Sequence, residues 1–264
     1  MRSIRQAVRV VVVSALAATA GPLAAADGPG LPFGKSLAGG QELPLPFGVG
    51  LTVYSQNQDY RLARLGFDLA GVTIDSGAIA IDNGIQEVNV QLDAWLLPFL
   101  NVFAIAGKID GRTNVDFTRV AGLPVPLGRL RIDYDGEVYG LGTTLAAGKG
   151  NVFGMLTAIW TTENLTGDFD SEAEALVVSP RVGLRDERGA VWIGATYQDV
   201  QETHRGTITL PFLGPIGFDV ELEEDDPWNF HVGAATALSK HWTLHAEGGL
   251  AQRATAEFGA TYRF

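Results

Sequence analysis

The sequence predicts an all-β protein: a transmembrane, antiparallel, up-and-down β-barrel of about ten strands. The first observation is that apolar and polar residues alternate in successive runs from Phe47 to Phe264, which is the period of two that strands show. The second is that each run contains the roughly 9–11 residues that a tilted strand needs to cross a bilayer. The third is that no apolar run is long enough for a spanning helix, whereas the 33 glycines suit tight turns and close strand contacts.

The bulk composition excludes several classes of function. At 264 residues, an all-β barrel is commonly a single domain. The formal net charge of −11 argues against a nucleic-acid-binding surface. The absence of cysteine rules out disulfides and thiolate metal ligands, and no cofactor is expected.

Residues 1–26 have the three parts of a secretory signal peptide. The basic start contains Arg2, Arg5 and Arg9. The apolar core runs over Val10–Ala20, and the small-residue cleavage site is Ala24–Ala26. The core is too short to cross a membrane as a helix. A cytoplasmic amphipathic helix is the alternative, but it does not account for the cleavage site, so we expect an exported chain.

The following residues, 27–46, are rich in glycine and proline. These residue types disfavour a helix or a central strand. We therefore expect a short periplasmic N-terminal segment, followed by a barrel formed by residues 47–264.

The alternating runs and their connections give the strand count. Runs lie at residues 47–54, 88–96, 103–110, before 147, 152–162, 176–184, 191–198, 230–238, 242–247 and 254–264. Short connections lie at Pro98, 148–151, 186–189 and 239–241, and longer ones around 70–77, 119–128, 164–173 and 211–217. We interpret three longer connections, within 66–81, 117–132 and 208–220, as hairpins that extend the wall beyond the membrane. Ten strands follow, or twelve if residues 57–83 hold an extra pair.

The last six residues carry a resemblance to a known family. The ending from Gly259 to Phe264 resembles the Gly-x-x-Φ-x-Φ terminus of bacterial outer-membrane β-barrel proteins, where Φ is a bulky apolar or aromatic residue. Gly259, Tyr262 and Phe264 occupy the motif positions. The resemblance implies a Gram-negative-type outer membrane, contact with its lipid and lipopolysaccharide, and recognition of the C-terminal strand by the barrel-assembly machinery. It also implies short periplasmic turns and long outer loops.

Periodicity alone does not distinguish this barrel from a soluble sandwich or a soluble barrel, whose apolar face points inward. The signal peptide and the terminal aromatic residue favour the membrane. Trp228 and Trp242 agree with this interpretation, because with Tyr262 and Phe264 they lie near strand ends, where aromatic girdles form at the membrane interfaces.

Assigning faces by parity directs ten ionisable side chains into the barrel. They are Asp93, Lys108, Asp110, Arg112, Arg181, His231, His245, Glu247, Glu257 and Arg263. Isolated charges in a low-dielectric interior are costly, so these groups are expected to be paired or hydrated. A barrel of ten strands is only slightly wider than side chains can fill. The residues therefore form either a polar core that blocks flow or the lining of a narrow water-filled path.

The last three strands are close enough in sequence for their register to be predicted. The short turns place Gly233 opposite Glu247, and Glu247 opposite Glu257. Two facing carboxylates repel each other. We therefore expect Arg253 or a histidine to neutralise one of them, with His231 diagonal to Glu247.

Enzyme signatures are missing from the sequence, which has no Gly-x-Ser-x-Gly, His-Glu-x-x-His or glycine-rich phosphate loop. We expect no enzyme activity. The weaker alternative is a lipid- or peptide-modifying enzyme at the outer rim. A protease there would use His204 with Asp225 and Asp226, whereas a lipid-modifying enzyme would lack a serine near His204.

Two acidic outer loops are candidate sites for divalent cations. One contains Asp168, Asp170, Glu172 and Glu174, and the other contains Glu221, Glu223, Glu224, Asp225 and Asp226. Carboxylate oxygens are the ligands that Ca²⁺ and Mg²⁺ prefer, although charge runs usually serve to keep a surface solvated.

Taken together, these features favour a structural or narrow-pore, porin-like role with a charged lumen and extended outer hairpins. The alternative is a surface-binding or adhesion barrel, whose hairpins recruit a partner through exposed strand edges or Leu-Pro tips. The sequence identifies no solute or partner.

Overall fold

The structure is a computed structural model, and it describes residues 30–39, 42–67, 79–119, 128–167, 171–210, 214–224 and 227–264. Side chains are described for these residues except 61–67, 171–172, 201–210 and 214–224. The chain divides into Met1–Gly30 and Leu31–Phe264, and the barrel belongs to the second unit. The predicted signal peptide, residues 1–26, lies outside the described residues.

The described residues form eleven strands. They are β1 (Phe47–Phe67), β2 (Ala80–Leu97), β3 (Leu100–Asp116), β4 (Arg129–Lys149), β5 (Val152–Gly167), β6 (Ser171–Arg185), β7 (Gly189–Leu210), β8 (Gly214–Glu224), β9 (Trp228–Ala237), β10 (Trp242–Leu250) and β11 (Arg253–Arg263).

Ten of these strands close into an antiparallel ring. Strands β1 to β7 pair in sequence order, β7 pairs with β9, and β9, β10 and β11 follow, with β11 pairing back onto β1. The closing seam runs from Gly48 opposite Arg263 to Gln58 opposite Arg253. The predicted ten-stranded barrel is thereby confirmed. The alternative of twelve strands is wrong, because residues 57–67 continue β1 and residues 80–83 begin β2.

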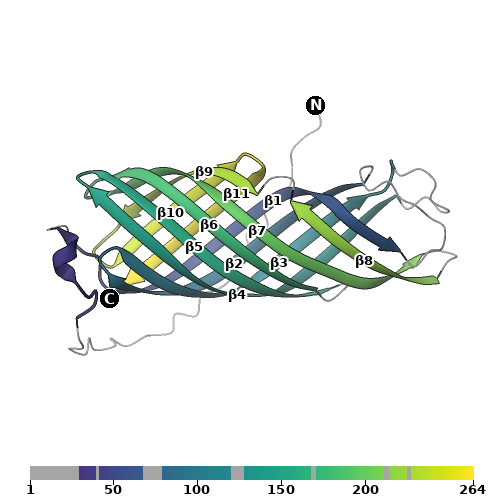
Figure 1. Cartoon of the computed structure of the whole chain (residues 1–264), viewed down its shortest axis with the longest axis horizontal. Coiled ribbons are helices and arrows are strands. Elements are labelled where there is room, and N and C mark those ends of the chain that lie inside the picture. The colour runs from purple at the N-terminus through teal and green to yellow at the C-terminus, as the bar shows by residue number, and fades with distance from the viewer. Residues whose placement is uncertain are drawn as a thin grey trace. The chain divides into compact units, whose positions relative to one another are not determined.

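The eleventh strand, β8, extends the wall beyond this ring. It pairs with β7 through Leu210 and with β1 from Tyr60 onward. Figure 1 shows the short strands β9, β10 and β11 towards one end of the barrel and β8 at the other. Beyond the ends of β9–β11 the ring is therefore closed by eight strands, β1–β8. The predicted wall-extending hairpin at residues 208–220 corresponds to β7 and β8.

The two ends of the barrel differ in their connections. At the end that we call the turn end, strands are joined at residues 98–99, 150–151, 186–188 and 238–241, as predicted. Gly150 makes one of these turns with φ of 60°, in the left-handed region that glycine adopts without strain. The Asp186 carboxylate makes another by accepting hydrogen bonds from the N–H groups of Arg188 and Gly189 at 2.8 and 3.0 Å. The opposite end, which has the two longest connections, residues 68–79 and 117–128, is the loop end.

From the turn end to the tops of β9–β11, the outer face of the ring is apolar. Its exposed side chains include Val49, Leu51, Val53, Val88, Val90, Leu92, Leu141, Leu145, Val152, Leu156, Trp160, Leu176, Val182, Leu184, Val191, Ile193, Phe230, Val232, Leu244 and Phe258. In water this continuous apolar surface would be unfavourable, whereas hydrocarbon solvates it.

The segment before the barrel contacts the turn end. The Phe33 N–H donates to the Leu96 carbonyl at 2.8 Å, and the Trp95 N–H donates to the Pro46 carbonyl at 2.8 Å. We expected no helix here, but Lys35–Ala38 form a 3-10 turn, η1, because Gly34 and Gly39 flank it with φ of 64° and 62°. Among the described residues, no helix is both long and apolar enough to cross a membrane.

Candidate functional site

Inward-facing rings in the barrel lie over glycines of the neighbouring strand. The pairs directly opposite each other are Phe103 and Gly142, Tyr134 and Gly111, Phe153 and Gly183, Trp192 and Gly233, His231 and Gly194, and His245 and Gly259. A Cβ atom added at any of these glycines would come within 3.0 Å of its ring. The rings therefore lie along the wall, in space that only glycine leaves free.

The most connected charged group of the interior is the Glu247 carboxylate on β10. Arg181 on β6 donates to it through Nε at 2.9 Å and through Nη2 at 3.2 Å. The indole N–H of Trp192 donates to Oε2 at 2.6 Å. These contacts neutralise a carboxylate whose side chain is only 12% exposed.

His231 lies beside this cluster. Its Nδ1 is 3.6 Å from Glu247 Oε1 and 3.1 Å from the Thr196 hydroxyl. Its Nε2 points to Gly194 and has no hydrogen-bond partner within the described part of the chain. The imidazole is thus held against the wall, with no described nucleophile at Nε2.

The predicted register of the last three strands is confirmed: Glu247 is opposite both Gly233 and Glu257. The two carboxylates have different partners, because His245 Nε2 lies 3.0 Å from Glu257 Oε1 while Arg181 binds Glu247. Arg253 is the other residue expected to act here. Its guanidinium is buried and donates to the Pro227 carbonyl at 3.2 Å.

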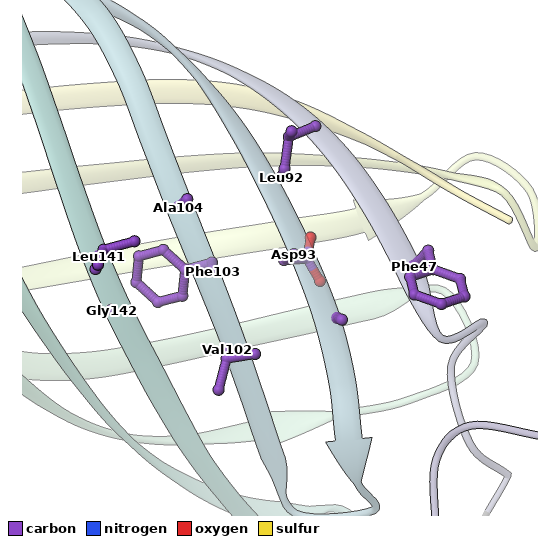
Figure 2. Close-up of a pocket in the computed structure, with 9 residues that line it drawn as sticks. Phe47, Leu92, Asp93, Val102, Phe103, Ala104, Leu141 and Gly142 are labelled. Atoms are coloured by element: carbon purple, nitrogen blue, oxygen red, sulfur yellow. The ribbon is translucent and has the colours of Figure 1, made fainter.

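A second charged cluster lies at the turn end of the seam. Arg263 on β11 reaches Asp93 on β2, with Nη2 at 2.9 Å from Oδ1. The Asn101 amide on β3 donates to the same oxygen at 2.7 Å. Figure 2 shows Asp93 on β2, Phe103 on the adjacent β3 and Gly142 on β4, which are among the residues that line a shallow groove in the wall. The apolar residues of this groove are Phe47, Leu92, Ala94, Val102, Ala104 and Leu141.

The inward assignment of Lys108, Asp110 and Arg112 is wrong. All three are exposed on the outer face of β3, while the residue between the first two, Ile109, is 2% exposed and faces the interior. Arg112 pairs outside with Asp133 at 2.8 Å. The apolar-out rule fails here because this part of β3 lies at and above the tops of β9–β11, where the outer face meets water.

Charge pairing on this outer surface is extensive. Arg131 and Arg112 donate to Asp133 and hold the pKa of that carboxyl below its ordinary value. Arg129 donates to Asp116 at 2.9 Å. Such pairs are typical of a solvated surface and not of a bilayer-facing one.

The interior at the base of the eight-stranded part is filled by side chains that we call the packed layer. Its members are each less than 9% exposed: Gln56, Gln58, Ile81, Ile109, Val138, Leu165, Ala173 and Ala175. The amide of Gln56 donates to Gln58 at 2.9 Å, and the Tyr54 hydroxyl donates to Gln56 at 2.7 Å. Half-buried Glu163 also faces inward here, opposite Val138 and Ala173. Eight strands enclose just enough room for side chains to fill.

Parity reasoning missed several members of these clusters. Trp192 and Asn101 bind the two central carboxylates but carry no charge, so the ionisable residues of the sequence do not include them. Glu87 on β2 also faces the interior and accepts from Asn89 at 2.8 Å. Glu87 directly precedes the predicted run 88–96 and has the same parity as Asp93. Extending that run by one residue would therefore have placed Glu87 inward.

Other candidate residues have different outcomes. Asp168, Asp170, Asp225 and Asp226 lie outside the described residues. The side chains of Glu172, Glu221, Glu223, Glu224 and His204 are not described either, so these candidate sites stay predictions. Within the described ranges, no three His, Asp or Glu side chains are placed to hold a metal ion. The strand β8 pairs with a neighbour on each side, so its described backbone offers no long free edge for a partner.

The residues of the C-terminal motif divide between the two faces of β11. Tyr262 and Phe264 lie outside, where Tyr262 contacts Trp242 with ring centroids 5.1 Å apart and Phe264 stacks on Phe47 at 6.0 Å. Gly259 faces inward under the His245 ring. Trp228 contacts Tyr197 at 5.3 Å near the tops of the short strands. The aromatic residues therefore gather at both edges of the apolar belt.

Comparisons with known proteins give similarities to solved structures only. No protein-family model and no curated protein matches the chain. The transport unit of the autotransporter AIDA-I from Escherichia coli is similar with a TM-score of 0.46 and 8% identity, covering 83% of this chain and 90% of that one. The outer-membrane protease OmpT from Escherichia coli is similar with a TM-score of 0.46 and 8% identity, covering 85% and 99%.

A third solved structure is the outer membrane protein OprG from Pseudomonas aeruginosa, with a TM-score of 0.45 and 11% identity, covering 84% of this chain and 98% of that one. At these identities and TM-scores, the likeness carries no conclusion about the function of this chain.

Proposed function

We propose that this chain is an integral protein of a bacterial outer membrane and that its interior is a narrow passage closed, in this conformation, at the base of the eight-stranded part. The turn end faces the periplasm and the loop end faces outward. The exposed apolar belt between the two groups of aromatic residues contacts lipid. The signal peptide expected at residues 1–26 and the C-terminal motif support the same location.

The observation that carries the closed passage is the burial of the packed layer above a charged lumen. Ile109 and Val138 are 2% and 1% exposed, so water does not reach them. The layer combines apolar side chains, including Leu165, with Gln56 and Gln58, which are hydrogen-bonded to each other. A constriction filled in this way leaves no space for hydrated ions. Below it, Arg181 with Glu247 and His245 with Glu257 line a polar interior. We therefore assign the chain a structural or narrow-pore role and not that of a wide diffusion pore.

Planar-bilayer recordings test this assignment. The full-length mature chain is expected to give no current steps, or steps far smaller than those of an open ten-stranded tube. The double variant Ile109→Ala/Leu165→Ala removes two buried side chains from the packed layer and is expected to increase single-channel conductance at least several-fold.

Leu141→Ala is the matched control, because Leu141 is 64% exposed and contacts lipid in the same account. It is expected to leave the recordings unchanged. Large, stable current steps from the unaltered chain would overturn the closed passage, and so would a packed-layer variant that folds but conducts no better than the control.

A further inference from the structure

The turn end of the seam contains an arrangement that the passage does not require. Three inward positions on three adjacent strands lie in one row: Arg263 of β11 is opposite Gly48 of β1, and Gly48 is opposite Asp93 of β2. Gly48 has no side chain, so Arg263 reaches across β1 and contacts Asp93 at 2.9 Å. A Cβ atom at position 48 would lie within 3.0 Å of the Asp93 carboxylate.

The Asp93 carboxylate depends on this contact. Its side chain is 0% exposed. One oxygen, Oδ1, is shared by Arg263 and Asn101, and the other has no hydrogen-bond partner within the described part of the chain. A buried carboxylate without its cation is strongly unfavourable. Asn101 belongs to β3, the hairpin partner of β2, so the β2–β3 hairpin alone already positions Asp93.

Arg263 reaches this position only when the barrel is closed. It is the last residue of β11, and β11 is not adjacent to β2. Once the seam has paired to its end, Phe264 and Phe47 exchange two backbone hydrogen bonds at 3.0 and 3.2 Å, and their rings stack. Arg263 Nη1 also donates to the Leu45 carbonyl at 3.3 Å, so the segment before β1 is bound at the same place.

From this geometry we infer that Arg263, Gly48 and Asp93 form a closure latch, which holds the first and last strands together as the final step of barrel assembly. The C-terminal strand then has two separate roles. Its outer aromatic residues form the motif expected for recognition, and its inner arginine secures the seam. The latch concerns closure and not transport, so it goes beyond the proposed function and stands or falls independently of it.

A cross-linking assay measures closure directly, because the chain has no native cysteine. The reporter pair Leu51→Cys/Ala260→Cys lies on facing residues of β1 and β11. The control pair Val90→Cys/Ala106→Cys lies on facing residues of the β2–β3 hairpin. The full chain is refolded from urea into lipid vesicles, oxidised at successive times, and resolved on gels.

Arg263→Gln is expected to slow seam cross-linking by about tenfold or more while leaving the hairpin reporter unchanged, because it leaves the Asp93 charge unpaired. Gly48→Ala is expected to do the same by pushing the carboxylate away. Gly50→Ala is the matched control on the same face of β1, since a Cβ there meets its nearest atom at 3.5 Å, an ordinary contact.

The double variant Asp93→Asn/Arg263→Gln removes both charges and is expected to close faster than Arg263→Gln alone. The latch is overturned if Arg263→Gln and Gly48→Ala close at the unaltered rate, or if Gly50→Ala slows closure as much as Gly48→Ala. It is equally overturned if the double variant changes the closure rate by the product of the factors measured for Asp93→Asn alone and for Arg263→Gln alone. The two residues would then act without coupling.

Discussion

At the scale of residues, a few interior side chains each bind several partners from different strands. Glu247 is the clearest case, because Arg181 and Trp192 both donate to it. Sequence parity placed Glu247 inward and the turn lengths gave its neighbours. Parity and turn lengths could not predict that Arg181 contacts Glu247. The two residues lie on β6 and β10, which are separated by β7 and β9, so the contact crosses the interior. Register is a local property that short turns determine, whereas contacts across a lumen depend on the closed ring.

Removing the Arg181 guanidinium tests the charged cluster. Arg181→Met leaves the Glu247 carboxylate without its cation in a place where it is only 12% exposed. We expect a loss of about 3 kcal/mol in the free energy of unfolding, measured by urea titration in lipid vesicles. Arg181→Met/Glu247→Gln is expected to recover part of this loss, and a double variant no more stable than the single one would contradict the pairing.

Acid is expected to loosen the outer end of β3 within a defined pH window. The Thr118 hydroxyl and N–H, followed by Arg129, lower the pKa of Asp116 from 3.8 to about 2. Because the folded-state pKa is depressed, its stabilising contribution is fully present above the ordinary carboxyl pKa. It is lost as the pH falls from about 4 to about 2. Hydrogen exchange of residues 113–119 is expected to rise in this window in the unaltered chain, and Asp116→Asn should remove that pH step.

At the scale of elements, strand β3 shows where a simple alternation rule stops working. Alternate residues face outward along the whole strand, but the environment of the outer face changes. Near the turn end the outer face meets lipid, and from Lys108 onward it carries charges while Ile109 faces inward. The sequence contains the alternation but not the height of the membrane boundary. The large apolar residues Phe103 and Ile105 suggested the wrong face for a separate reason. They face inward within the lipid-facing part, where Phe103 lies over Gly142.

The ring-over-glycine pairs are the other feature of the strands with a direct test. A Cβ at Gly233 would come within 3.0 Å of the Trp192 indole, whereas a Cβ at Gly154 meets its nearest atom at 3.8 Å. Gly233→Ala is therefore expected to cost about 1–3 kcal/mol by forcing the ring away from the wall. Gly154→Ala is expected to be close to neutral. Unfolding in urea compares the two, and equal losses would argue that the ring has room to move freely.

At the scale of the whole molecule, the chain consists of a ten-stranded ring continued by an eight-stranded one. The long strands β1–β7 belong to both, and β8 replaces β9–β11 in the second. The strand number, the short turns and the register of the last three strands could be predicted from alternation and turn residues. The pairing of β8 with β1 could not, because these strands are far apart in sequence and nothing local specifies their contact.

This two-part architecture explains why the sequence resembles a membrane barrel in one part and a soluble barrel in the other. In the ten-stranded part, apolar side chains face outward and the charged clusters face inward. At and above the packed layer the distribution is reversed, with the Arg112–Asp133 pair outside and Ile109 and Val138 inside. The same backbone alternation serves both because only the solvent outside the wall changes.

A scan of single cysteines along the outer face of β3 tests this central claim most directly, since the native chain offers no competing thiol. In lipid vesicles, cysteines at Val102, Ala104 and Ala106 are expected to resist a water-soluble maleimide, and those at Lys108, Asp110 and Arg112 to react rapidly. Buried Ile109, replaced in the same way, should stay protected. Reaction at Ile109 with protection at Lys108 and Arg112 would contradict the account, because those charged side chains would then face the interior.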